Sequence, residues 1–299
     1  MLSTLPLSFV TVVETGSITQ AADVLSIAKS AVSQNLKRLE EELGVKLATR
    51  TTRRFSLTPA GERYYRRCKE ILALSQRAAT EMEDFGATPA GSITLTAPHA
   101  MIAPVIAPAL SNVINQYPRL KPTIIADDKR LDLIASGIDV AITVGKLADS
   151  SLRARKVGVL NDVLCASPEL LQNIKLGHSA RTISQLEALP YIAHSREEGI
   201  CTHRLSNKKQ SLTVKFEPSL FANTVAATLA LTRAGLGIAL LPSLAVADDL
   251  RSGALIELFP NFSLPQKDIY AVHAYDTMPP KSVTEVINAV RKELMTEYP

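Results

Sequence analysis

Apolar residues recur at helical spacing through the first part of the chain. One such stretch covers residues 5–13 and ends at Gly16, and a second covers residues 18–25 and begins after Ser17, a residue suited to an N-cap. In a third stretch the apolar positions follow the steps i, i+4, i+7 and i+11, namely Val32, Leu36, Leu39 and Leu43. Only residues 26–28 separate the second and third stretches, so the pattern predicts a helix-turn-helix.

The third predicted helix has a second, polar face. Four residues at i, i+3, i+4 and i+7 form it, namely Ser30, Ser33, Gln34 and Lys37, and all are short, hydrogen-bonding or basic. A helix with such a face fits the major groove of DNA, although a solvated surface helix would show the same pattern. Because Ala28 cannot cap this helix with a side chain, Ser30 is an alternative N-cap, which would start the helix later and turn Ser30 away from the groove.

Two short strands and a long helix are predicted next. Residues 46–58 alternate as a hairpin with a Thr- and Arg-rich tip, where Arg50, Arg53 and Arg54 are suited to DNA phosphates or a minor groove. Thr58-Pro59 is a helix start, and the helix is expected to run to about Phe85. It carries a heptad-like seam of six residues: Tyr65, Cys68, Leu72, Ser75, Ala79 and Met82. The seam predicts contact with the same helix of a second copy, with packing on its own domain as the alternative.

After a Gly- and Pro-containing hinge at residues 86–91 the pattern changes to alternating strands and helices. Strands are expected over 92–97, 122–127, 138–144, 160–166, 190–194, 211–216, 237–241 and 269–274. Helices are expected over 102–116, 131–136, 224–234 and 282–298, with another starting near Ser167-Pro168. Such alternation predicts α/β architecture with a mostly parallel sheet covered by helices on both faces.

The N-terminal segment of residues 1–69 is basic, whereas the rest of the chain is nearly neutral. Of the net charge of +4, residues 1–69 carry +5, from 11 Lys and Arg against 6 Asp and Glu, and the remaining residues carry −1. This asymmetry is typical of a small domain that meets a polyanion. The sequence has no apolar run long enough for a membrane span, no secretory signal pattern and three widely spaced cysteines, so we expect a cytoplasmic protein with reduced thiols.

Several motifs together resemble the LysR-type transcriptional regulators. In the first 61 residues they are Phe9, Glu14, Gly16-Ser17, Ala21-Ala22, Leu25, Ser30-Ala31-Val32-Ser33, Leu39-Glu40, Leu43-Gly44, Arg50-Thr51, Leu57-Thr58 and Ala60-Gly61. Further along they are Pro104, Pro108, Tyr117-Pro118, residues 137–142, 166–168 and 234–242, Gly253 and Leu255. The chain departs from the family at Lys29-Ser30, where Gln-Pro is frequent. Lys29 is expected to add a phosphate contact in place of a base-reading amide.

The resemblance implies a domain plan. It consists of an all-α winged helix-turn-helix at residues 1–58, a dimerising linker helix and hinge at 59–90, and an α/β effector-binding domain at 91–299. That last domain would be two-lobed like periplasmic solute-binding proteins, with lobe I at 91–162 and 268–299 and lobe II at 163–267. The implied activity is sequence-specific binding to double-stranded promoter or operator DNA by a homodimer or homotetramer. Effector binding between the lobes would alter DNA bending and contact with RNA polymerase.

The resemblance and the residue types together nominate two sites. The DNA-binding candidates are Lys29, Ser30, Ser33, Gln34, Lys37, Arg38, Arg50, Arg53 and Arg54. Effectors of α/β lobes lie beyond the carboxyl ends of strands and near helix N-termini. The effector candidates are therefore Pro98, His99, Ala100, Met101, Val144, Gly145, Lys146, His194, Ser195, Arg196, Asn223 and Thr224. His99, Lys146 and Arg196 favour an anionic effector, and residues 149–155 resemble the subgroup that binds aromatic or organic acids. A helix cap for His99 and solvated charges for Lys146 and Arg196 are the alternatives.

Three other functions fit the sequence less well. A redox-responsive regulator of the same architecture would use Cys201. An α/β enzyme would need a motif such as GxSxG, GxxxxGK[ST], HExxH or CxxC, and none occurs. A transport solute-binding protein would leave residues 1–61 unexplained. No cofactor is expected, and the five histidines lack metal-site spacing.

Overall fold

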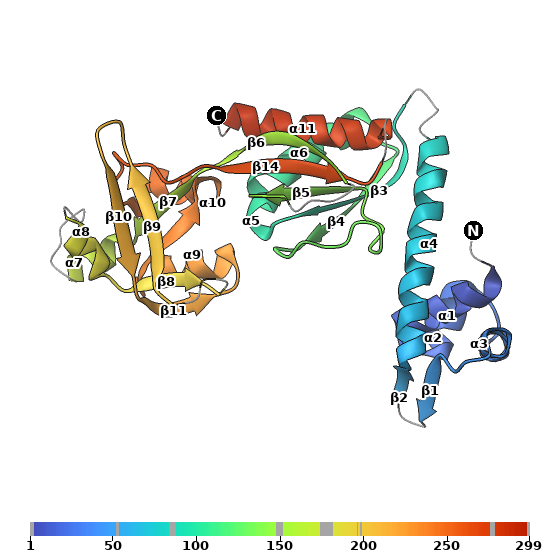
Figure 1. The fold of residues 1–299 in the computed structure, drawn as a ribbon. Coiled ribbons are helices and arrows are strands. Elements are labelled where there is room, and N and C mark those ends of the chain that lie inside the picture. The colour runs from blue at the N-terminus through green and yellow to red at the C-terminus, as the bar shows by residue number, and fades with distance from the viewer. Residues whose placement is uncertain are drawn as a thin grey trace.

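The computed structural model describes residues 3–51, 54–83, 88–147, 152–173, 182–195, 197, 199–275 and 279–297. The chain forms an N-terminal head of helices and a hairpin, then one long helix, then two α/β lobes (Figure 1). The head lies at one end of the molecule and the second lobe at the other (Figure 1). Among the described residues no helix is long and apolar enough to cross a membrane.

Local signals account for the first helices of the head. They are α1 (Thr4–Thr15), α2 (Ile18–Leu25) and α3 (Lys29–Leu43). Gly16 ends α1 in the left-handed conformation with φ of 65°, and the Ser17 hydroxyl accepts a hydrogen bond from the backbone N–H of Gln20. The apolar stripes of the three helices meet in the interior, where Phe9, Val12 and Val32 are fully buried.

Helix α3 has the earlier of the two starts that the sequence allowed. The helix begins at Lys29 with Ala28 at the N-cap position, and no side chain caps it. The prediction that Ser30 caps a later start is therefore wrong, because Ser30 already lies in the first helical turn. An uncapped N-terminus typically costs on the order of 1 kcal/mol, which burial of Val32, Leu36 and Leu39 offsets.

A hairpin closes the head. Its strands β1 (Ala48–Thr51) and β2 (Arg54–Leu57) are antiparallel, with Ala48 opposite Leu57. The next helix, α4 (Pro59–Glu83), starts where the Thr58 hydroxyl accepts the Gly61 N–H at 3.0 Å and donates to the Lys46 carbonyl at 2.7 Å. A Cβ on Gly61 would lie 1.9 Å from the Leu47 carbonyl oxygen, so only glycine allows α4 to approach the hairpin this closely.

The expected seam of α4 is divided between two environments. Cys68 is buried, and Tyr65 and Leu72 pack with it against Phe9 and Leu39 of the head. These three seam residues belong to the head's own core, which was the alternative interpretation of the pattern. Ser75 is half-buried, Met82 is exposed, and the side chain of Ala79 lies outside the described residues.

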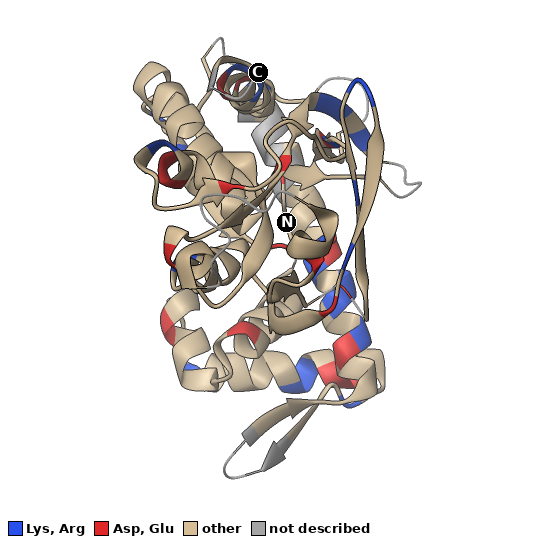
Figure 2. Cartoon of the chain, turned by 90° about the vertical axis from the view of Figure 1, so that its left-hand side faces the viewer, with Lys and Arg blue, Asp and Glu red and all other residues tan. Residues whose placement is uncertain are grey.

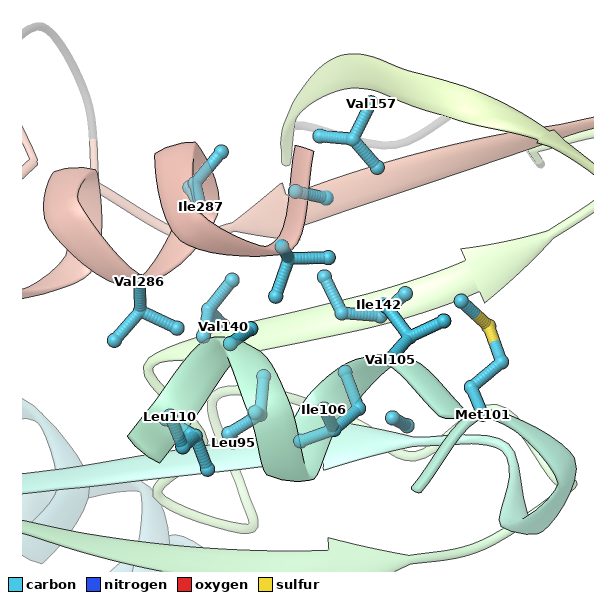
Figure 3. Packing of buried hydrophobic residues seen from close by; sticks show 14 of the residues in the cluster. Leu95, Met101, Val105, Ile106, Leu110, Val140, Ile142, Val157, Val286 and Ile287 are labelled. Atoms are coloured by element: carbon cyan, nitrogen blue, oxygen red, sulfur yellow. The ribbon is translucent and has the colours of Figure 1, made fainter. Parts of the chain in front are cut away.

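Lobe I is a five-stranded sheet covered by helices. Its strand order is β4-β3-β5-β14-β6, with bounds β3 (Gly91–Ala97), β4 (Leu120–Ala126), β5 (Val140–Val144), β6 (Arg153–Leu160) and β14 (Lys267–His273). Its helices are α5 (His99–Met101), the π-helical turn η1 (Ile102–Ile106), α6 (Ala107–Gln116) and α11 (Lys281–Glu297). In its core, Leu95, Val140 and Ile142 of the strands pack with Ile106 and Ile287 of the helices (Figure 3).

Lobe II repeats this plan with a hairpin added. Its sheet order is β11-β8-β12-β7-β13, with bounds β7 (Asp162–Ala166), β8 (Tyr191–His194), β11 (Pro218–Ala222), β12 (Ile238–Pro242) and β13 (Ile256–Glu257). The hairpin comprises β9 (Cys201–Ser206) and β10 (Ser211–Phe216). The helices are α7 (Pro168–Asn173), α8 (Ile183–Glu187), α9 (Val225–Arg233) and α10 (Ser243–Ser252).

Three expectations for the lobes need correction. Residues 133–137 form turns and not a helix, because the Asp132 carboxylate accepts the N–H groups of Ile134 and Ala135 and competes with helical bonding. The sheets are mixed rather than mostly parallel, since β14 is antiparallel to β5 and β7 is antiparallel to β12. The strand expected over 160–166 is two strands in different sheets, β6 and β7.

Two adjacent segments join the lobes. The chain leaves lobe I after Leu160 and returns at Lys267, and these two residues are paired across β6 and β14. Asp162 begins β7 and Lys267 begins β14, so each lies one residue across the lobe boundary expected from the resemblance. An ion pair between the Asp162 carboxylate and the Lys267 ammonium ties the two segments together.

Candidate DNA interface and effector cavity

The polar face of α3 lies on the outside of the head. Lys29, Ser30, Gln34, Lys37 and Arg38 are exposed, and Ser33 is half-buried. On the opposite side of the same helix, the buried stripe of Val32, Leu36 and Leu39 fixes the helix against α1 and α2. The sequence-predicted recognition residues are therefore presented together on a rigid support.

The cations of this face are paired only on the surface. Lys37 lies 3.7 Å from Glu41, and Arg38 lies 3.0 Å from Glu42 in i,i+4 pairs with mostly exposed side chains. Exposed pairs of this kind contribute little stability, so these cations can exchange their carboxylate partners at little cost.

Glu40 connects α3 to the base of the hairpin, a role that the sequence did not predict. Its carboxylate accepts the backbone N–H groups of Leu47 at 3.0 Å and Ala48 at 3.3 Å, and it pairs with Lys46 at 2.6 Å. Burial alone would raise the pKa of Glu40, but these hydrogen bonds and the Lys46 charge hold the pKa below its usual value. The ionised carboxylate therefore fixes the angle between α3 and the hairpin.

The space between α3 and the hairpin base forms one hollow. Ser33, Gln34 and Lys37 line it together with Lys46 and Ala48. Lys46 is thus a further cation of this surface that the sequence pattern did not single out. Arg53 lies outside the described residues, as do the side chains of Arg50 and Arg54. The backbone places Arg50 within β1, opposite Phe55, and Arg54 at the start of β2.

A cavity of about 880 Å³ lies beyond the strand ends of lobe I. Lobe II reaches it through His194 and Val225, and Leu160 and Lys267 contribute from the connecting segments. One wall is apolar and is formed by five side chains: Leu131, Leu133, Leu147, Leu152 and Val272. Asp127, Asp128, Lys129 and Arg130 also line the cavity. A molecule bound here would touch both lobes and the segments that join them.

Part of the predicted effector set lines this cavity. Pro98, Val144 and His194 do so, and Val225 follows directly after Thr224, whose hydroxyl caps α9 by accepting the Ala227 N–H at 3.2 Å. The side chain of Met101 is buried in the lobe I core, and its predicted contact with an effector stays a prediction. The remaining predicted positions, Ala100, Gly145, Lys146, Ser195 and Asn223, are not among the lining residues, and Arg196 lies outside the described ones.

His99 is held by a neighbouring carboxylate. Its backbone N–H donates to the Asp128 carboxylate at 3.0 Å, and its ring Nδ1 lies 3.5 Å from the other carboxylate oxygen. Asp128 lines the cavity while His99 does not. The histidine therefore orients a cavity residue, and its predicted direct contact with an effector stays a prediction.

The sequence pattern missed Thr143, the most unusual polar group of the cavity. Its hydroxyl is buried and has no hydrogen-bond partner among the described residues. A buried hydroxyl without a partner is costly, typically by 1 to 3 kcal/mol. A polar residue within the otherwise apolar strand 140–144 was the available signal.

Burial makes the described cysteines poor nucleophiles. Burial raises the pKa of Cys201, with the Glu197 charge adding to it, and raises the pKa of Cys165 to about 12. Cys68 is also buried, and none of the three forms a disulfide. No group of three or more His, Cys, Asp or Glu that could hold a metal ion lies within the described residues.

The head and the cavity together define a class of protein. A helix-turn-helix is joined by one long helix to a two-lobed domain (Figure 1). The helix-turn-helix has an exposed polar face, and the two-lobed domain has a ligand-sized cavity. This combination is that of a DNA-binding regulator with a small-molecule sensor. Two family models match the chain: "Bacterial regulatory helix-turn-helix protein, lysR family" over residues 7–62 and "LysR substrate binding domain" over residues 86–295. The chain belongs to the LysR-type transcriptional regulators.

Similar proteins cover nearly the whole chain. The regulator PtxR of Pseudomonas aeruginosa is 32% identical over 290 residues, covering 97% of this chain and 92% of PtxR. The transcriptional activator AaeR of Escherichia coli is 32% identical over 289 residues, covering 94% and 90%. Among solved structures, full-length AphB of Vibrio cholerae has a TM-score of 0.63 at 25% identity and covers 97% of this chain and 98% of AphB. CrgA of Neisseria meningitidis has a TM-score of 0.58 at 30% identity and covers 99% and 98%. The curated relatives are transcriptional regulators.

Proposed function

We propose that α3 reads the bases of an operator and that a small organic acid bound in the cavity modulates this binding. The observation that carries the first half is the exposed row of Gln34 and Lys37 above the buried stripe of α3. Gln34 and Ser33 are assigned to base edges in the major groove, where amides and hydroxyls discriminate between bases. Lys29, Ser30, Lys37 and Arg38 are assigned to flanking phosphates, and Arg50, Arg53 and Arg54 to phosphates or the minor groove beside the hairpin.

The test of base reading compares two kinds of DNA. Gln34→Ala removes the amide, and each bidentate base contact is worth about 1–3 kcal/mol of discrimination. We expect operator affinity to fall roughly tenfold or more while affinity for random DNA stays the same. Gln116→Ala, on the exposed surface of α6 far from the head, is the matched control. An equal loss on both kinds of DNA would contradict the assignment.

The cavity supports an effector that is part apolar and part anionic. The five apolar side chains of its wall suit an aromatic ring or an alkyl chain. Lys129 and Arg130 provide cations next to the Asp127 and Asp128 carboxylates, and Lys267 is paired with Asp162. The hydroxyl of Thr143 offers a hydrogen bond that nothing described within the protein satisfies. We therefore assign a small aromatic or aliphatic carboxylic acid with one further polar group.

Assembly is proposed to proceed through α4. Its exposed face carries Ile71, Leu74 and Met82, of which Leu74 has 64% of its side chain exposed. We assign the contact with a second copy to these exposed residues, because Tyr65, Cys68 and Leu72 of the predicted seam pack inside the head. Leu74→Asp should lower the sedimentation coefficient to that of a smaller species, whereas Val24→Asp, on an equally exposed residue of α2, should not. Further association to a tetramer and contact with RNA polymerase belong to the same proposal.

Redox sensing through Cys201 has less support than effector sensing. The residue is 5% exposed, and its raised pKa keeps the thiol protonated and slow to react. Operator binding before and after peroxide treatment should therefore be the same for the parent protein and for Cys201→Ser. A response that only the parent protein shows would establish the redox alternative.

A further inference from the structure

The β9–β10 hairpin of lobe II carries a concentrated positive charge. Residues 201–216 contain Arg204, Lys208, Lys209 and Lys215 and no Asp or Glu, whereas the whole of residues 70–299 carries a net charge of −1. All four cations are exposed, and none forms an ion pair with another described residue. Figure 2 faces this end of the molecule and shows Lys and Arg along the hairpin and at its tip.

The fold holds these cations outward. On the inner face Leu205, Val214 and Phe216 are buried in the lobe II core, and the Phe216 ring stacks on Tyr191 with 4.4 Å between ring centroids. Because side chains alternate across a strand, Arg204 and Lys215 must then face outward. At the tip, the side-chain oxygen Oδ1 of Asn207 accepts hydrogen bonds from the backbone N–H groups of Lys209 and Gln210, both at 2.9 Å. These bonds fix the turn that carries Lys208 and Lys209.

We propose that this hairpin binds the phosphate backbone of DNA outside the site read by α3. The proposal rests on the DNA-binding function proposed above and adds a second contact surface to it. The hairpin lies at the opposite end of the molecule from the head (Figure 1). The hairpin therefore reaches the DNA only where the duplex bends, or where a second copy of the protein brings its lobe II close to the duplex. The extent of DNA bending would then depend on the position of lobe II.

The composition of the outer face favours DNA over an acidic protein. On the outer face of the two strands the other side chains carry hydroxyls: Thr202, Ser206, Ser211 and Thr213. The exposed amide of Gln210 follows Lys209 at the tip. Lys, Arg, Ser and Thr are residue types that commonly contact DNA phosphates. Protein interfaces instead centre on buried aromatic and apolar anchors and are poor in Lys and Ser. The outer face of β9 and β10 offers no such anchor, and the nearest exposed apolar residue is Ile200, directly before β9. Two acidic groups lie nearby: the Glu187 carboxylate accepts the backbone N–H of Lys215 at 2.8 Å, and the exposed Glu217 directly follows β10.

The first test measures the salt dependence of DNA binding by the full-length protein. The probe is a random-sequence duplex of about 200 base pairs, and the variant is Lys208→Gln combined with Lys209→Gln. Each lost phosphate contact should reduce the slope of log K against log salt by about 0.9, so we expect a shallower slope and weaker binding at low salt. Arg291→Gln with Lys292→Gln, two exposed cations of α11, removes the same charge elsewhere and should leave the slope at the parental value.

The second test identifies the partner directly. A photo-crosslinker attached at Thr213→Cys, on the outer face, is activated with that duplex and RNA polymerase both present. We expect crosslinks to DNA. Crosslinks to a polymerase subunit, or parental salt slopes in the Lys208/Lys209 variant, would overturn the proposal. The head's function is judged separately, because it fails only if the parent protein itself does not bind DNA.

Discussion

The DNA interface and the effector cavity are built in opposite ways. The interface candidates on α3 come from one continuous segment, Lys29 to Arg38, and reach a common surface by helical periodicity alone. The cavity residues come from strand ends, turns and connecting segments between Thr96 and Val272. The first surface is fixed by local structure and can be identified from spacing, whereas the second exists only once the whole regulatory domain has folded.

The largest expected effect separates the stability of the two regions. Phe9 is fully buried in the head and packs against Tyr64 with 5.7 Å between ring centroids. Phe9→Ala should destabilise the head by about 3–5 kcal/mol because it leaves a cavity. We expect DNA binding to be lost while a ligand of the cavity still raises the melting temperature of the lobes. Phe221→Ala, on a residue with 53% exposure, is the control and should retain both activities. Simultaneous loss of ligand binding in Phe9→Ala would show that the two regions are one folding unit.

A smaller effect tests the cavity alone. Thr143→Val keeps the shape of the side chain but removes the buried hydroxyl that lacks a partner. The ligand-free protein should become more stable by roughly 1 kcal/mol, because the cost of the unpaired hydroxyl disappears. In a thermal-shift screen of carboxylic acids against their neutral amides, the acids should stabilise the parent protein and stabilise Thr143→Val less. An identical shift in both proteins would mean that the effector does not use this hydroxyl.

The smallest effect concerns pH. The head contains no histidine, whereas lobe II partly buries His203. Its ring Nε2 lies 3.0 Å from the Tyr191 hydroxyl, and Glu197, Asp162 and Lys267 are the charged groups around it. Burial lowers the pKa of His203 below 6.5, so the folded protein favours neutral imidazole and the unfolded chain binds the proton more strongly. The stabilising contribution is therefore complete above pH 6.5 and is lost as the pH falls through the lower pKa of the folded state.

The unfolding of each region should report this difference. Between pH 7.5 and about 5.5 the lobes should lose stability while the head changes little. His203→Gln should flatten part of the dependence, and the rest is expected from His273, whose pKa burial also lowers. If the unfolding transition of the head shifted with pH as much as that of the lobes, the pH dependence could not be assigned to His203 and His273.

The sequence predicted most of what depends on neighbouring residues. The caps at Gly16 and Ser17, the buried stripe of α3 and the Thr58-Pro59 start of α4 follow from spacing and side-chain type. It could not separate β6 from β7, because a change of sheet between Leu160 and Asp162 leaves no mark in a continuous apolar pattern. It could not place Met101 in the core or Thr143 in the cavity either, since both depend on which distant strands become neighbours.

One measurement tests the coupling of the two regions most directly. Energy transfer between dyes at the two ends of an operator, titrated with full-length protein, reports DNA binding through its midpoint and DNA bending through its plateau. We predict that an acid that stabilises the lobes shifts the midpoint or the plateau of the titration on the operator. With the Gln34→Ala variant on random DNA, the same acid should change neither the midpoint nor the plateau. An acid that binds the cavity and leaves both quantities unchanged on the operator would contradict the account.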